Sequence, residues 1–176
     1  LGLALACELS GTDEIAESLY TICARTDAAY VPHAAFGLAR LRAARNDLDG
    51  VQSALALVSP TSSAYPLARQ HWAEALAGAP RDLADLDLAL STAATAGFSR
   101  RRRAEIAVDV YRDGLARVEK DGPTAGAQVG GRPATADGLK AGLENSLRDL
   151  AATTENPIER LRLVDEANAV RPWSLV

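Results

Sequence analysis

The chain has 176 residues and a formal net charge of −4, and 48% of its residues are hydrophobic but only 5% are aromatic. This length suits one ordinary domain or one short array of repeats. A core of Leu and Ala with few aromatic residues favours closely packed helices over a sheet. The acidic balance argues against a nucleic-acid partner, because a phosphate-binding surface needs excess positive charge. No segment approaches the roughly 18 uncharged apolar residues of a membrane-spanning helix.

The cysteines indicate the cellular compartment, and the first residues indicate whether the chain is part of a longer protein. Cys7 and Cys23 are the only cysteines, and neither belongs to a C-x-x-C pair. Two interpretations stand: two small buried side chains in a reducing cytosol, or a disulfide between two antiparallel helices. The chain contains no Met and begins inside a Leu/Ala pattern with no preceding helix cap. We therefore expect it to be a fragment of a longer protein.

The first 60 residues contain an internal repeat. Residues 3–20 align with residues 38–55 at a shift of 35, and each copy contains a helix end, a tight turn and a new helix. Gly11 and Asn46 fit the left-handed conformation of a helix end, and Thr12 and Asp47 are suitable caps for the next helix. A period of about 34 residues is typical of tetratricopeptide helical hairpins. Residues 1–60 are therefore predicted to form two such hairpins.

Residues 61–120 continue the helical pattern as degenerate pairs. Apolar spacing predicts helices over 64–77, over 81–96, and from a cap at Ser99 to residue 120. The first of these helices is expected to bury Leu67, Trp72 and Leu76.

Residues 121–137 are rich in Gly and Pro and lack large apolar side chains, so we predict a mobile loop. A last helix pair is predicted over 138–172, and Asn156-Pro157 is a strong start signal for its second helix. That helix is expected to bury Leu161, Val164, Ala167 and Val170, with Trp173 covering the final layer. The fold class is then all-α: one domain over 1–176, a right-handed α-solenoid of antiparallel helix pairs with about nine helices.

One helix of the repeat carries the candidate binding residues. His33, Phe36 and Arg40 fall at i, i+3 and i+7 on the first helix of a hairpin, the helix that lines the concave groove of tetratricopeptide arrays. Arg69 and His71 fall near the equivalent place in the third pair. The hypothesis is a peptide- or protein-binding groove. The alternative is that Phe36 packs in the core and the others are ordinary surface residues.

Arg100, Arg101, Arg102 and Arg103 form the densest charge run. Four arginines at a helix N-terminus oppose the helix dipole, at a cost of a few tenths of a kcal/mol each. A basic docking patch for an acidic protein surface or an anionic lipid is one interpretation, and a solvated corner is the other.

Motifs for catalysis are absent from the sequence. It contains no G-x-x-x-x-G-K-[ST], H-E-x-x-H or G-x-S-x-G pattern, which would hold phosphate, zinc or a nucleophilic serine respectively. We therefore expect no catalytic residue, no metal and no cofactor in this chain, and predict a non-catalytic protein-interaction domain.

Five segments along the chain form an ordered set. They are Arg25-Thr26-Asp27, Ala34-Ala35-Phe36-Gly37-Leu38-Ala39-Arg40, Gly131-x-Pro133-x-Thr135-x-x-Gly138-Leu139-Lys140, Glu144-x-Ser146-Leu147-Arg148 and Leu163-Val164-Asp165-x-Ala167-Asn168-x-Val170-Arg171-Pro172. Together they resemble the C-terminal tetratricopeptide domain of the actinobacterial serine/threonine protein kinase G family. The matches cover most of the chain, whereas the segment from Ser59 to about Thr124 agrees only in helical character.

The resemblance implies a longer parent with a rubredoxin-like module that holds a metal and a kinase domain that uses ATP and Mg²⁺, both upstream. It implies recruitment of a forkhead-associated (FHA) substrate that controls 2-oxoglutarate dehydrogenase and glutamate metabolism. It further implies contact with the protein's own kinase domain, a homodimer, and coupling to a membrane-bound amino-acid sensor. The implied location is cytoplasmic, and peripheral at the membrane only through a protein partner.

Two other functions remain open from the sequence. A tetratricopeptide-type sensor region of a bacterial transcription regulator would have a helix-turn-helix or ATPase segment elsewhere in its chain. A small enzyme would need titratable residues that converge, and His33 has no candidate partner at a readable spacing.

Overall fold

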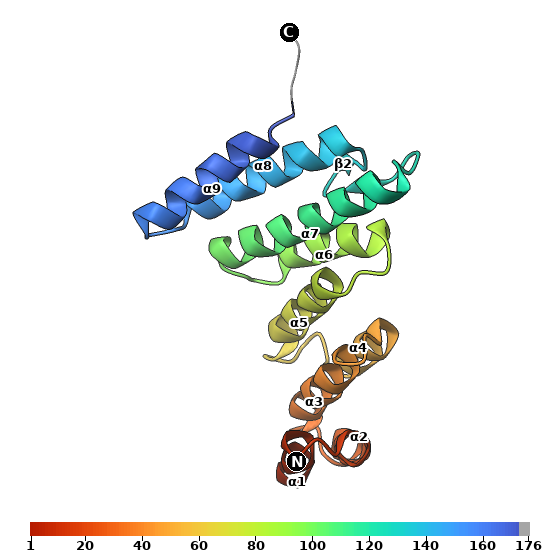
Figure 1. Ribbon diagram of the computed structural model, residues 1–176. Coiled ribbons are helices and arrows are strands. Elements are labelled where there is room, and N and C mark those ends of the chain that lie inside the picture. The colour runs from red at the N-terminus through yellow and green to blue at the C-terminus, as the bar shows by residue number, and fades with distance from the viewer. Residues whose placement is uncertain (173–176) are drawn as a thin grey trace. The chain divides into compact units, whose positions relative to one another are not determined.

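The computed structural model describes residues 1–172 and is almost entirely helical over that range (Figure 1). Nine α-helices and one pair of short strands account for its regular structure. The chain divides into two compact units, Leu1–Ala75 and Leu76–Val176, with the boundary inside the fifth helix. The predicted all-α class is confirmed, whereas Trp173 lies outside the described residues.

The first unit begins with the two predicted hairpins. Its helices are α1 (Gly2–Leu9), α2 (Asp13–Thr26), α3 (Val31–Ala43), α4 (Leu48–Leu55) and the greater part of α5 (Tyr65–Gly78). Gly11 and Asn46 have φ of 74° and 55°, which confirms the left-handed turns predicted after α1 and α3. Asp47 caps α4, since its Oδ1 accepts a hydrogen bond of 2.9 Å from the Gly50 N–H. Thr12 makes no side-chain cap; its hydroxyl donates to the Cys7 carbonyl oxygen instead.

Small residues let the helices of this unit approach closely. Ala4, Ala16, Ala34 and Ala35 are fully buried, and they share one core cluster with the large side chain of Tyr20. The Tyr20 ring lies against Gly37, where an added Cβ would overlap the ring. A glycine is therefore required at this crossing of α2 and α3.

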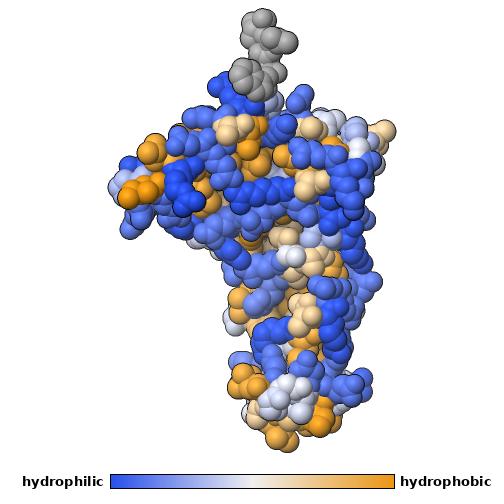
Figure 2. Space-filling model, in the orientation of Figure 1, coloured by the Kyte–Doolittle hydropathy of each residue, from blue (hydrophilic) through white to orange (hydrophobic). Residues whose placement is uncertain are grey.

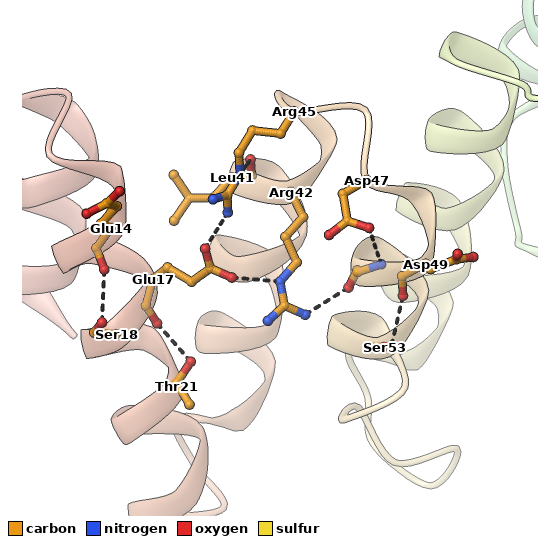
Figure 3. Close-up of polar contacts among 11 residues, drawn as sticks. Glu14, Glu17, Ser18, Thr21, Leu41, Arg42, Arg45, Asp47, Asp49 and Ser53 are labelled. Atoms are coloured by element: carbon orange, nitrogen blue, oxygen red, sulfur yellow. Dashed lines mark hydrogen bonds and ion pairs between the residues drawn. The ribbon is translucent and has the colours of Figure 1, made fainter.

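A charged cluster also joins α2, α3 and α4 (Figure 3). Glu17 on α2 accepts hydrogen bonds from Arg42 on α3 and from Arg45 in the turn that follows α3. Arg42 donates a further bond of 3.0 Å to the Gly50 carbonyl oxygen on α4. The first two hairpins are thus fixed to one another by side chains as well as by the alanine core.

The second unit contains the remaining elements, which are α6 (Leu83–Thr95), α7 (Arg100–Asp121), β1 (Gln128–Val129), β2 (Arg132–Pro133), α8 (Ala136–Ala152) and α9 (Pro157–Val170). Helix α7 packs against α6 and α8, and α9 lies along α8 (Figure 1). Ser99 caps α7 by accepting from the Arg102 N–H, and Asn156 caps α9 by accepting from the Ile158 and Glu159 N–H groups. Both of these predicted helix starts are confirmed.

Residues 127–134 form a packed hairpin in place of the mobile loop that the composition predicts. Strands β1 and β2 pair antiparallel, with Val129 opposite Arg132. Val129 is fully buried and Ala134 almost so, and the hairpin contacts α6 and α8. The Gly130 N–H donates a 2.8 Å hydrogen bond to Asp87 Oδ1 on α6. Two buried side chains and one specific bond to a helix are enough to order a segment with few apolar residues.

Two predicted core faces are wrong in part. Leu67 is 44% exposed, because α5 buries Ala68, Ala73 and Leu76 on a different stripe. Leu161 is 62% exposed, because the buried stripe of α9 runs through Ala167 and the half-buried Leu163. Two residues along a helix correspond to about 200° of rotation, which places Leu161 on the side away from Leu163.

Candidate protein-binding groove

An open groove of about 520 Å³ lies between α1, α2 and α3 of the first unit. Its lining includes the three residues that the sequence places on one face of α3, together with residues of α1 and α2. The full set is Leu1, Gly2, Leu5, Glu8, Leu9, Tyr20, His33, Phe36 and Arg40. We call this surface the α1–α3 groove.

One wall of the α1–α3 groove is a row of exposed leucines. Leu1, Leu5 and Leu9 follow at spacings of four residues, so they lie on one face of α1. They are 38%, 45% and 81% exposed, respectively. Figure 2 shows hydrophobic surface gathered at the end of the first unit that α1 and α2 form. Contiguous exposed apolar surface is a feature of interaction sites, so this strip is a candidate for one.

The other wall contains a fixed polar cluster of Glu8, Arg40 and Tyr20. Arg40 donates two hydrogen bonds to the Glu8 carboxylate, from Nε to Oε1 at 2.9 Å and from Nη2 to Oε2 at 2.8 Å. The Tyr20 hydroxyl donates a third bond of 2.6 Å to Oε2. The Glu8 side chain is only 17% exposed, whereas Arg40 is half exposed. Paired bonds from one guanidinium hold both side chains in a single geometry.

This arrangement changes the acid–base behaviour of each member of the cluster. The hydrogen bonds from Arg40 lower the pKa of Glu8, and the pKa of the Arg40 guanidinium is raised in return. Burial, followed by the nearby Glu8 carboxylate, raises the pKa of Tyr20 to about 12. The cluster therefore has one charge state at neutral pH: ionised Glu8, ionised Arg40 and a protonated Tyr20 that donates.

Phe36 joins the α1–α3 groove to α5. Its ring lies 5.2 Å from the His71 ring, centroid to centroid, with the two planes tilted by 56°. Phe36 also packs against the buried core of the first unit, so it lines the groove and is half-buried. His71 Nδ1 lies 3.8 Å from Glu74 Oε2. Arg69 is half-buried on α5 and is not among the residues that line this groove.

The arginines at the start of α7 are mostly paired with carboxylates. Arg100 bonds Asp149 at 2.9 Å, and Arg101 and Arg102 both bond Glu105. Arg101 also reaches Glu159 on α9 at 3.4 Å. Arg100, Arg101 and Arg102 therefore form ion pairs on the surface of the second unit, and the run presents much less free positive charge than the sequence indicates.

Sequence reasoning missed Glu8, Tyr20 and the α1 leucines as groove residues. The leucine spacing of four along α1 was an available signal, because it places one apolar stripe on a helix that also contains a buried Ala4 on another face. Glu8 and Arg40 are 32 residues apart in the sequence, so no local pattern predicts that they pair.

Residues 1–172 contain neither a cluster of potential metal ligands nor a membrane-spanning helix. No three His, Cys, Asp or Glu side chains in this range gather as metal ligands would. No helix in it is both long enough and apolar enough to span a bilayer. Cys7 and Cys23 are free thiols, and both are half-buried. The structure therefore contains no disulfide between Cys7 and Cys23.

Comparison with known proteins identifies the family. Residues 1–174 match the family described as protein kinase G tetratricopeptide repeat. The chain is 31% identical over 99% of its length to the serine/threonine-protein kinase PknG of Mycobacterium leprae, and equally so to that of Mycolicibacterium smegmatis. It spans 23% of the length of each of these relatives, both of which are serine/threonine-protein kinases. The chain therefore belongs to the protein kinase G tetratricopeptide repeat family.

Proposed function

We propose that this chain binds polypeptide partners of a serine/threonine kinase through the α1–α3 groove and is itself non-catalytic. The observation that carries the proposal is that exposed Leu1, Leu5 and Leu9 line one groove together with the fixed Glu8–Arg40 pair. Because both walls are built on helices, binding needs little ordering of the groove. Aliphatic side chains of a partner would lie on the leucine wall, and its polar groups would meet Arg40 and His33.

The family relationship supports a more specific version of this proposal. The partner recruited would be an FHA-domain substrate that controls 2-oxoglutarate dehydrogenase and thereby glutamate metabolism. The same domain would contact its own kinase domain, support a homodimer, and couple the kinase to a membrane-bound amino-acid sensor. In this version the protein acts in the cytoplasm and reaches the membrane only through a protein partner.

A matched pair of leucine substitutions on α1 tests the groove. Leu5 lines it and is 45% exposed, whereas Leu3 is 66% exposed and is not among its lining residues. Leu5→Glu places a carboxylate on the apolar wall beside Glu8, so affinity for a purified FHA-domain substrate should fall roughly tenfold, or about 1.4 kcal/mol. Leu3→Glu adds the same charge to the same helix and should leave the affinity within about twofold.

Biolayer interferometry with the immobilised chain measures both affinities, and circular dichroism checks that the two variants remain equally helical. Equal weakening by both substitutions would show a general effect of added charge and refute the groove assignment. Failure of the unaltered chain to bind the FHA-domain protein would refute the choice of partner.

A further inference from the structure

We propose that a second groove, on the second unit, binds an acidic segment of a polypeptide partner through Arg103. The inference deepens the proposed function, since it adds the chemistry of a partner segment to a domain that binds polypeptides. The groove measures about 400 Å³ and lies between α6, α7 and the end of α8. Its lining comprises Leu90, Ala93, Ala94, Arg100, Arg103, Ala104, Ala107 and Asp149. We call it the α6–α7 groove.

The α6–α7 groove has an alanine floor and a cationic rim. On α7, Arg100, Arg103, Ala104 and Ala107 fall at i, i+3, i+4 and i+7, so they share one face of the helix. Leu90, Ala93 and Ala94 on α6 give the opposite side. The small side chains leave room for an extended backbone or for small side chains of a bound peptide.

Of the four arginines at the start of α7, Arg103 is the one without an ion pair among residues 1–172. Arg101 and Arg102 are held by Glu105, and Arg100 is held by Asp149 across the groove. Within residues 1–172, the Arg103 side chain has no carboxylate within the 4.0 Å that defines an ion pair. It lies in the first turn of α7, where the helix dipole adds positive potential. A carboxylate entering the groove would be attracted by both the Arg103 guanidinium and the helix dipole.

The distribution of charge favours a peptide carboxylate over a lipid surface. An anionic membrane binds a broad array of cations, roughly four to eight of them together. Here three of the four arginines already bond to carboxylates, so the run does not present such an array. A single acidic side chain with small apolar neighbours matches one free guanidinium beside an alanine floor.

The test measures binding of a fluorescein-labelled peptide of alternating Glu and Ala by fluorescence anisotropy. Arg103→Gln should weaken binding by about tenfold, the value of one charge-assisted hydrogen-bonded pair. Arg101→Gln removes the same charge from the same helical turn but outside the groove, and should change the affinity by less than about twofold. The corresponding Gln–Ala peptide should not bind measurably.

Equal effects of the two arginine substitutions, or equal binding of the Gln–Ala peptide, would overturn the inference. So would binding of phosphatidylserine vesicles without binding of the Glu–Ala peptide. The outcome is separable from the test of the α1–α3 groove. If Leu5→Glu abolishes binding of the FHA-domain protein while Arg103→Gln leaves peptide binding intact, only the inference about the α6–α7 groove fails.

Discussion

The Glu8–Arg40 pair allows a quantitative test of how the α1–α3 groove is held in shape. We consider Glu8→Gln, Arg40→Gln and the double substitution as a double-mutant cycle, which isolates the interaction between the two side chains. Two hydrogen bonds join them, and the Glu8 side chain is 17% exposed while Arg40 is 50% exposed. A fully exposed pair contributes about 0.2–1 kcal/mol, and a hydrogen bond to a charged group about 1.5–3 kcal/mol. Because one partner is half in water, we expect a coupling free energy of about 1–2 kcal/mol.

The two single substitutions should differ from one another. Arg40→Gln leaves a largely buried Glu8 carboxylate with Tyr20 as its remaining donor, whereas Glu8→Gln leaves a guanidinium that water reaches. The free energy of unfolding should therefore fall more for Arg40→Gln than for Glu8→Gln.

The effect of pH gives an independent check on the same pair. Because the pKa of Glu8 is lowered from 4.5 in the folded state, its contribution to stability is complete above that value. The contribution is lost as the pH falls through the lower folded-state pKa, so the difference between the unaltered chain and Glu8→Gln should shrink in acid. Urea titrations at low salt, followed by far-UV circular dichroism, measure both quantities. A coupling energy below about 0.3 kcal/mol at neutral pH, or one that does not change in acid, would refute the reasoning.

Two further predictions concern the second unit. Gly142→Ala should destabilise it by about 1–3 kcal/mol, because the added Cβ overlaps the Tyr111 ring. At Gly114 the nearest atom to an added Cβ is Leu86 Cδ1 at 3.4 Å, so Gly114→Ala should be neutral or stabilising. Thermal melts that rank the two variants in reverse would contradict this prediction. Val129→Ala should lower the free energy of unfolding by about 1–2 kcal/mol, because Val129 is fully buried. Gln128 is exposed, so Gln128→Ala should change the free energy of unfolding little. Equal urea midpoints for the two variants would show that the hairpin is not packed.

The helix ends were predictable because each depends on a few adjacent residues. A residue that tolerates positive φ, followed by a capping side chain, is enough to predict the turns at Gly11 and at Asn46–Asp47. Thr12 shows the limit of this reasoning, since its hydroxyl has a competing acceptor at the Cys7 carbonyl oxygen. A cap is local in sequence, but the choice between two acceptors depends on the geometry of the turn.

The β-hairpin was not predictable, since what orders it lies elsewhere in the chain. Val129 is buried by elements that precede and follow it, and the bond from the Gly130 N–H ends on Asp87, 43 residues away. Gly130 has φ of 60° and lies close to the Tyr111 hydroxyl, so glycine is needed both for the turn and for space. Composition alone describes such a segment as a loop.

Only part of the candidate site was predictable, because residues distant in the sequence complete it. The spacing of His33, Phe36 and Arg40 along α3 requires only that the segment be helical, and the structure places all three in one groove. Their partners come from other helices, since Glu8 precedes Arg40 by 32 residues and Tyr20 precedes it by 20. Periodicity identifies the face of a helix, but not which side chains from neighbouring helices meet it.

Packing of the repeat and the chemistry of the α1–α3 groove are connected through one side chain. The Tyr20 ring reaches the groove only because Gly37 presents no Cβ where α2 and α3 cross. With its pKa raised to about 12, the Tyr20 hydroxyl remains a donor throughout the physiological range, and Glu8 is thereby held toward Arg40. A side chain at position 37 would move the ring, and the carboxylate and guanidinium would follow it. The polar wall of the groove is accordingly set by the buried core of the hairpins, while the leucine side chains on α1 stay exposed beside it.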